Sequence, residues 1–309
     1  MPFTRRVKFN SAHVLAGSVL VGILVPPLSQ LCRPLVFPSI FFLMLLSLMQ
    51  MDLPALWLRF GADARSLALI VCWQMVLLPV AIILIHRLTP LGGEFTEIAF
   101  FTACACSIFG SAAFARLMGL DDGMTLKATL LSVLVMPITL PFLAAWVRED
   151  GFAFDYVGYG WRLIIYLLIP LALAWWYNRR PRLREAIGSH SIIRHGPVIF
   201  LSLFAIGVMD GIGVLILNKP LDMASLLALA FAIHLGQFVA GSLVFAWRGR
   251  NYALTVGLLS SYRNLGLLTA VAGDLLPAQF IVFLGIWQIP MYCMPLLLGK
   301  MGFRRMDER

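Results

Sequence analysis

Arg263 is the residue whose type and position carry the clearest chemical potential. It interrupts an otherwise apolar stretch, 251–271, together with Ser260 and Asn264. At spacings of three and four, these three side chains share one face of a helix. If the stretch crosses a bilayer, a central arginine costs about 2.5–3.5 kcal/mol and normally faces a cavity or a partner. Two interpretations follow. Arg263 binds an anion or takes the role of a bound cation, or it pairs with an acid and fixes packing.

Asp210 is the one acid that falls deep inside an apolar stretch. Intramembrane carboxylates commonly pair with a cation or relay a proton, so Asp210 is a candidate partner of Arg263 or a proton carrier. An equally weighted alternative places Asp210 near the outer surface, in contact with water. His234 and Gln237, three residues apart, are better explained by hydrogen bonding between helices than by ligand binding.

The familiar patterns of enzymes and metal sites do not occur in the sequence. It contains no Gly-x-Ser-x-Gly segment, no His-Glu-x-x-His segment and no phosphate-binding loop. The five cysteines fall in or beside apolar runs, without the spacing of metal ligands: Cys32, Cys72, Cys104, Cys106 and Cys293. We therefore expect neither an enzyme nor a metal site.

These side chains need long apolar helices to position them, and the composition supplies such helices. Hydrophobic residues make up 61% of the 309 residues, charged residues only 13%, and the mean hydropathy is +0.89. Soluble domains carry about 25% charged residues, so a soluble enzyme and a nucleic-acid-binding domain are excluded. Roughly 20 apolar residues in a helix span a bilayer. The sequence predicts an all-α membrane protein with ten transmembrane helices, near residues 12–31, 35–53, 66–88, 94–118, 124–147, 158–178, 196–217, 224–246, 251–271 and 276–299.

The basic residues indicate how the spans are oriented. The net charge of +9 comes from short clusters between apolar runs, and the densest cluster, with five arginines, lies between residues 179 and 194. Because cytoplasmic loops are enriched in Lys and Arg, this pattern predicts that both termini are cytoplasmic and that the first span is retained. The expected location is the inner (plasma) membrane. The lipid bilayer is then a partner, and nucleic acid is not.

The basic loop divides the predicted spans into two groups of five with opposite orientations. We expect residues 1–150 to form a first five-helix repeat and residues 151–309 an inverted second repeat, within one integrated membrane domain. The fourth span of each half is interrupted by small or polar residues, at 107–111 and at 260–266. Interrupted helices at matching positions point to a substrate site in transporters. The alternative is that these Gly and Ser residues serve helix packing.

Four segments, in order, resemble the bile acid:sodium symporter family, and the resemblance covers nearly the whole chain. They are 42–53 (FLMLLSLMQMDL), 73–79 (WQMVLLP), 111–141 and 262–267 (YRNLGL). The resemblance implies ten helices, with a panel of spans 1, 2, 6 and 7 and a core of spans 3–5 and 8–10. It also implies that the broken spans four and nine cross in that core.

The resemblance further implies sodium ligands at the matching positions, which are Gln74, Ser111, Thr125 and Thr129. This sequence departs from the family at three others: Ala112 replaces an asparagine, Leu259 an acidic residue and Arg263 a glutamine. A sodium ion about 5 Å from the Arg263 guanidinium would be repelled by roughly 3 kcal/mol at an effective dielectric constant near 20. Sodium coupling is therefore disfavoured, and no other cofactor is expected.

The combined pattern predicts a secondary active transporter that carries a small organic anion across the cytoplasmic membrane. The alternative is a transport-inactive sensor or scaffold that keeps the transporter fold. Substrate identity, transport direction, coupling ion and oligomeric state stay open. Asp210 is the candidate for proton transfer or ion pairing, and the candidate substrate- or ion-binding residues are Gln74, Ser111, Thr125, Thr129, Ser260, Arg263 and Asn264.

Overall fold

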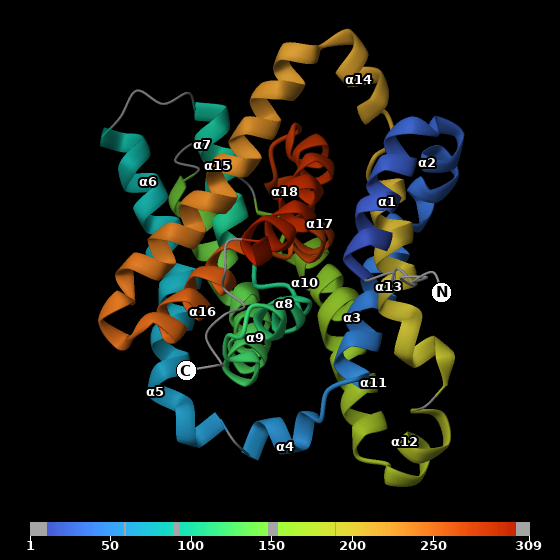
Figure 1. Ribbon diagram of the computed structural model, residues 1–309, viewed down its shortest axis with the longest axis vertical. Helices are drawn as coiled ribbons and strands as arrows, with labels where there is room; N and C mark the ends of the chain where they lie inside the picture. The colour runs from blue at the N-terminus through green and yellow to red at the C-terminus, as the bar shows by residue number, and fades with distance from the viewer. Residues whose placement is uncertain (1–10, 59, 89–92, 148–153, 189, 301–309) are drawn as a thin grey trace, which may run out of the picture.

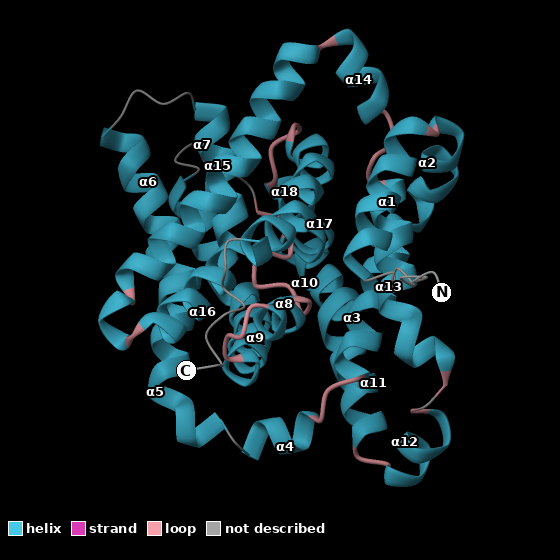
Figure 2. Cartoon of the chain, viewed as in Figure 1, coloured by secondary structure: helices cyan, strands magenta, loops and turns pink. Residues whose placement is uncertain are grey.

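The computed structural model describes residues 11–58, 60–88, 93–147, 154–188 and 190–300. The described residues form helices and no strand, which confirms the all-α prediction. The helices divide into two groups that lie side by side in Figure 1 and are joined by short helices at the two ends of the molecule (Figure 2). We call them the panel group and the crossing group.

The panel group lies on the right of Figure 1. Its helices pack mainly on α13 and α3, and they are α1 (Ser11–Leu24), α2 (Pro26–Cys32), α3 (Val36–Met49), α11 (Ile169–Asn178) and α13 (Ser191–Gly207). The short helix α12 (Pro181–Ile187) covers one end of this group. Its Leu183 and Ile187 pack against the buried Tyr177 and Ile193, which leaves the arginines of α12 exposed.

The crossing group contains the longest continuous helices and both interrupted ones. Helix α15 packs on α16 and α18, and α9 packs on α5, α8 and α16. The members of this group are α5 (Phe60–Cys72), α6 (Leu78–Leu88), α7 (Gly93–Cys104), α8 (Ser111–Leu117), α9 (Asp122–Val147), α15 (Pro220–Val244), α16 (Arg250–Ser261), α17 (Leu265–Ala272) and α18 (Phe280–Lys300). The short helix α4 (Leu53–Leu58) connects the groups, and so do α10 (Tyr156–Leu163) and α14 (Ile212–Asn218), which are end segments of the longer helical stretches Tyr156–Asn178 and His195–Asn218.

Six helical stretches in the described part of the chain are long and apolar enough to cross a membrane. They are Pro26–Met49, Asp63–Ile85, Asp122–Val147, Tyr156–Asn178, His195–Asn218 and Pro220–Val244. Their length and composition are those of a multi-span membrane protein. Shorter apolar helices cover Val14–Leu24, Leu265–Leu275 and Phe280–Cys293.

The predicted boundary between the first two spans is wrong. We expected the first span to run from 12 to 31, but α1 ends at Leu24 and the next helix begins at Pro26. Pro26 and Pro27 lack the N–H groups that would continue α1, whereas proline is well tolerated in the first turn of a new helix. The expected turn at Arg33 is instead a short 3₁₀ segment within a continuous helical stretch.

Two helices widen into a π-helical turn shortly before a proline. The turns cover Trp73–Leu77 and Ile164–Leu168, and each ends two residues before a proline, Pro79 and Pro170 respectively. A proline ring clashes with the carbonyl four residues earlier and removes one backbone hydrogen bond. The wider turn makes room for that clash while the helix continues. The first of these turns carries Gln74 at the interrupted helices.

Candidate functional site

The two interrupted helices are paired with each other through their breaks. The N–H of Ile108 donates to the carbonyl of Tyr262 at 2.9 Å, and the N–H of Asn264 donates to the carbonyl of Cys106 at 2.7 Å. Ser107 and Arg263 thereby form an isolated antiparallel bridge. Each break satisfies backbone groups that the other break leaves free, as a lipid-embedded chain requires. Both predicted interruptions are present, but they cover 105–110 and 262–264 rather than 107–111 and 260–266.

The guanidinium of Arg263 lies at this bridge and is completely buried. Nε donates to the carbonyl of Ser260 at 2.7 Å, and Nη1 to that of Ala105 at 2.8 Å. Nη2 donates to the carbonyl of Gln74 at 3.4 Å. Within the described residues, no carboxylate lies within ion-pair distance of Arg263, so its predicted pairing with an acid is not observed. The positive charge is instead surrounded by backbone carbonyl oxygens from three segments.

Helix dipoles explain why carbonyls alone can hold this charge. Ala105 directly follows the C-terminus of α7, and Ser260 lies in the last turn of α16. The last carbonyls of a helix have no partner within it and carry a partial negative charge, worth up to about 2 kcal/mol toward a cation in a partly buried site. The Arg263 guanidinium therefore lies where the negative ends of the α7 and α16 helix dipoles meet.

This arrangement does not fit a sodium ion. Unwound backbone carbonyls at half-helix C-termini are ligands that transporters offer to Na⁺. Here the Arg263 side chain engages those carbonyls, and the position expected to carry an acid is the apolar, buried Leu259. The positively charged side chain and the missing carboxylate both oppose sodium at this point.

Gln74 reaches the same place from the π-helical turn. Its backbone carbonyl accepts from Arg263, and its side-chain Oε1 accepts from the hydroxyl of Ser107 at 3.4 Å. That hydroxyl also lies 3.0 Å from the carbonyl of Leu259. Gln74 Nε2 is buried and lacks a partner in the described part of the chain. The resemblance thus identified a residue that the structure brings to Arg263.

The hydroxyl residues of α8 and α9 are only partly brought together. The hydroxyls of Ser111 and Thr129 lie 3.1 Å apart, so these two predicted site residues meet. Thr125 instead donates to the carbonyl of Asp121 at 2.6 Å, one turn earlier. That intrahelical bond is the usual role of a threonine in a membrane helix. The hydroxyl of Thr125 is therefore hydrogen-bonded within its own helix and not to another site residue.

Three residues that form hydrogen bonds at the site were not among the candidates from the sequence: Trp73, Ser107 and Ser132. Trp73 Nε1 donates to the Ser260 hydroxyl at 3.0 Å, which itself donates to the carbonyl of Val256. The N–H of Ser107 donates to the Ser132 hydroxyl at 3.2 Å. The position of Ser107 inside the predicted interruption was a usable signal. Trp73 and Ser132 gave none, because their partners lie on other helices.

Asp210 does not belong to the site. Its carboxylate pairs with Arg33 at 3.2 Å, where the Asp210 side chain is 15% exposed and the Arg33 side chain 76%. Of the two interpretations given to Asp210, the pairing with Arg263 is therefore not observed, whereas an ion pair with an exposed arginine agrees with a position near the surface. The two partners lie 177 positions apart, so sequence spacing offered no hint of the pair.

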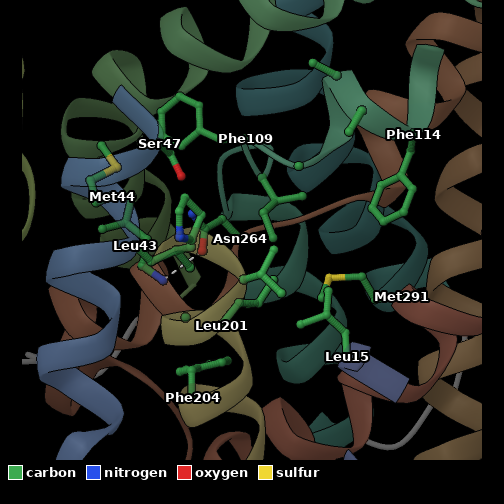
Figure 3. Close-up of a pocket in the computed structure, with 18 of the residues that line it drawn as sticks. Leu15, Leu43, Met44, Ser47, Phe109, Phe114, Leu201, Phe204, Asn264 and Met291 are labelled. Atoms are coloured by element: carbon green, nitrogen blue, oxygen red, sulfur yellow. Dashed lines mark hydrogen bonds between the residues drawn. The ribbon is translucent and has the colours of Figure 1, made fainter. Parts of the chain in front are cut away.

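A cavity of about 540 Å³ separates the panel group from the crossing. Figure 3 shows apolar side chains from both groups around it, among them Met44, Phe204, Phe109 and Met291. The polar lining residues are Ser47 and Gln50 from the panel group, and Arg263, Asn264, Gln288 and Tyr292 from the crossing group. The exposed Asp52 and Arg116 also line it. An apolar cavity with few polar groups is typical of a small-molecule site.

Asn264 links the cavity to the crossing. Its side-chain Oδ1 accepts from the N–H of Leu267 at 3.0 Å and so caps the N-terminus of α17. Leu265 and Gly266, the first residues of that helix, line the cavity as well. The positive end of the α17 dipole therefore faces the cavity, and Arg263 lines the cavity as well, although it is completely buried.

A search against protein-family models gave no match, and a search against curated proteins gave none either.

Proposed function

We propose that the chain is a secondary active transporter of a small organic anion, and that Arg263 serves as its built-in cation. The observation that carries the proposal is the Arg263 guanidinium, held by three carbonyl oxygens at a crossing of interrupted helices. Interrupted helices beside a cavity are the typical substrate site of secondary transporters. A permanent charge at that point makes an added sodium ion unnecessary, so the proposed transport is sodium-independent.

The proposed architecture is the ten-span inverted repeat. The six long apolar stretches, together with α1, α18 and the interrupted pairs α7–α8 and α16–α17, would supply ten crossings. Residues 1–150 and 151–309 would then each contribute five, with one interrupted helix at the fourth place. The cytoplasmic location of both termini and the inner or plasma membrane belong to the same proposal, since they rest on the charge pattern.

The cavity favours an anion with a sizeable apolar part as the substrate. Its walls are mainly apolar, which suits an organic body rather than a small inorganic ion. The α17 N-terminus and Arg263 contribute positive potential, which favours a carboxylate or sulfonate group. A neutral or cationic substrate would gain nothing from this potential.

Uptake by the purified full-length chain in proteoliposomes tests the proposal. The probes are radiolabelled cholate, benzoate and succinate, each with and without an inward sodium gradient, and with the cation choline as a control. We expect saturable uptake of at least one apolar anion at a rate that does not depend on sodium. Uptake that requires sodium would contradict the role given to Arg263.

The second candidate is a transport-inactive sensor or scaffold with the same fold. The observation that favours it is the locked crossing, in which each hydrogen-bonding nitrogen of Arg263 has a bound partner. It predicts that an organic anion raises the unfolding temperature of the protein but is never accumulated. The uptake assay and a thermal-shift assay on the same probes distinguish the two candidates.

A further inference from the structure

Three exposed arginines lie at the point where the helical stretch Tyr156–Asn178 ends. Arg179 and Arg180 directly follow this stretch, and Arg182 lies in the first turn of α12. We call these three residues the arginine cluster, and Figure 1 shows α12 at one end of the molecule. The stretch has 23 residues, which is enough to cross the hydrocarbon core of a bilayer. The arginine cluster therefore lies at the level of the lipid headgroups.

Two members of the arginine cluster are positioned by tryptophan rings. The guanidinium carbon of Arg179 lies 4.8 Å from the centroid of the Trp175 ring, and that of Arg180 lies 4.4 Å from the centroid of the Trp176 ring. A ring contact of this kind occupies one face of the planar guanidinium and leaves its N–H edge for an oxyanion. Tryptophan is itself enriched at the headgroup level of membranes. The two rings thus present two fork-shaped donors side by side at the membrane surface.

The protein supplies little negative charge to balance the arginine cluster. Five arginines and a single acid, Glu185, lie between residues 179 and 194. Arg184 is one of the five, and it pairs with Asp52 at 3.0 Å, which ties α12 to the start of α4. Within the part of the chain that the structure describes, no ion pair involves the arginine cluster. Its three charges therefore attract anions from outside the protein.

Arg248 provides a contrast to the arginine cluster. Its guanidinium carbon also lies over a tryptophan ring, 5.2 Å from the centroid of Trp247. However, its Nη1 donates to the hydroxyls of Ser66 and Tyr252, at 3.2 and 3.3 Å. Protein acceptors therefore bind the Arg248 guanidinium, which makes it a poorer receptor for an external anion.

An apolar stripe leads along the helical stretch to the arginine cluster. Ile165, Ile169, Leu173 and Trp176 follow one another at intervals of three or four residues and are 40–50% exposed. At this spacing they lie on one side of the helix, where a membrane places acyl chains. The stripe ends at Trp176, whose ring carries Arg180. A molecule that matches both parts has an acyl chain and a phosphate, which is the composition of a phospholipid.

We propose that the arginine cluster and the apolar stripe form a binding site for an anionic phospholipid. Arg179 and Arg180 bind the phosphate, Arg182 adds positive charge, and an acyl chain lies along the stripe. A guanidinium can donate two parallel N–H···O bonds to one phosphate, which a lysine cannot. Each basic residue near an anionic membrane surface contributes roughly fivefold to the affinity. The proposal goes beyond the transport function and does not depend on it, because it requires only that Tyr156–Asn178 crosses the membrane.

Lipid binding to the purified full-length chain can be measured by native mass spectrometry in detergent. The probes are phosphatidylglycerol, which is anionic, phosphatidylcholine, which has a phosphate but no net charge, and inorganic phosphate. We expect phosphatidylglycerol to bind at least tenfold more tightly than phosphatidylcholine, because three arginines act on its net charge. Equal affinity for the two lipids overturns the proposal. Displacement of phosphatidylglycerol by an equal concentration of inorganic phosphate would likewise overturn the lipid as the occupant.

Lysine substitutions separate this site from the general enrichment of basic residues at cytoplasmic surfaces. Arg179→Lys with Arg180→Lys keeps the charge, and with it the orientation in the membrane, but removes the planar forks that stack on the rings. We expect the double variant to bind phosphatidylglycerol about tenfold more weakly than the wild type. The matched control is Arg87→Lys, because Arg87 lies 5.7 Å from the Trp146 ring centroid, outside the arginine cluster. Full affinity in the double variant, or the same loss in the control, overturns the proposal.

A further variant covers the case in which the lysine variant does not fold. Trp176→Leu keeps an apolar side chain at a half-exposed position and changes no charge, but it removes the ring beneath Arg180. We expect at least a threefold lower affinity for phosphatidylglycerol with an unchanged unfolding temperature. Unchanged affinity would contradict the stacked geometry on which the site depends. Specific lipid binding by a protein that moves no anion would sink the transport function alone, whereas uptake without lipid preference would sink only the lipid site.

Discussion

Arg263 Nη1 and the carbonyl oxygen of Ala105 lie 2.8 Å apart, although the two residues are 158 positions apart in the chain. Through this bond a side chain from one interrupted helix closes the C-terminus of the other. The contact joins the first and second halves of the sequence at one buried point. The stability of the protein can be tested through this group, and so can the ion preference and transport that we propose for it.

Replacing Arg263 should destabilise the protein. Arg263→Gln removes the fork of donors and leaves buried carbonyls unpaired, which we expect to lower the free energy of unfolding by about 2–3 kcal/mol. Arg263→Lys keeps the charge but cannot reach three carbonyls in one plane. Its free energy of unfolding should therefore lie between those of the wild type and of Arg263→Gln. The unfolding temperatures of the three proteins, measured in detergent, give the order of their stabilities. The control is Arg116→Gln, which breaks an exposed ion pair with Asp122 and should change little.

The ion preference should be convertible by two substitutions. Arg263→Gln with Leu259→Glu removes a repulsive charge and adds an attractive one beside the same carbonyls. At roughly 3 kcal/mol per charge contact, sodium affinity should rise by two or more decades over that of the single variant Arg263→Gln. The measurement is the sodium dependence of both unfolding temperature and cholate uptake. An equal sodium response in the single and double variants would show that Leu259 does not face this position.

Filling the cavity should stop uptake without unfolding the protein. Ser47→Trp places a large ring on the wall opposite Asn264, in a cavity of about 540 Å³. We expect at least a tenfold lower uptake rate with an unchanged unfolding temperature. Leu243→Trp is the matched control, since Leu243 is 69% exposed on α15 and lines no part of the cavity. Equal uptake by the two variants would place the substrate elsewhere.

The orientation in the membrane can be tested by labelling. A cysteine at Arg182, exposed on α12, should react with an impermeant maleimide only from the cytoplasmic side. A cysteine at Asp222, exposed at the start of α15, should react only from the outside. Figure 1 shows α12 and the start of α15 at opposite ends of the molecule. Reversed labelling would overturn the proposed position of both termini and leave the fold intact.

The interrupted helices could be predicted because the sequence pattern that marks them is confined to a few neighbouring residues. Runs of small and polar residues at 107–111 and 260–266 stand out against apolar flanks, and the structure breaks both helices there. The importance of Arg263 followed from the cost of burying its charge. What it binds could not be predicted, because backbone carbonyls carry no sequence signature. Their positions depend on how α7, α16 and the Gln74 turn come together.

The expectations that the structure did not reproduce all concern which residues become neighbours in the fold. Asp210 was a candidate partner for Arg263 because both are charged residues in apolar stretches, but its partner Arg33 lies in the 3₁₀ segment of the stretch Pro26–Met49. Thr125 satisfies its hydroxyl within its own helix. His234 and Gln237 gave the pattern of interhelical hydrogen bonds, yet the His234 ring contacts the rings of Tyr262 and Trp287, and the Gln237 amide has no partner among the described residues. Each outcome depends on tertiary packing, which spacing along the chain does not encode.

The exchange of backbone bonds between the two breaks has a consequence for the biogenesis of the protein. Among the residues that the structure describes, the N–H of Ile108 has its acceptor in Tyr262, and the carbonyl of Cys106 has its donor in Asn264. Since the ribosome delivers the chain from the N-terminus, the α7–α8 break enters the bilayer long before its partner has been synthesised. Until residue 264 emerges, that break must be shielded by the insertion machinery or stay in contact with water. A nascent chain arrested before this point should therefore remain associated with the translocon, and release should coincide with the synthesis of α17.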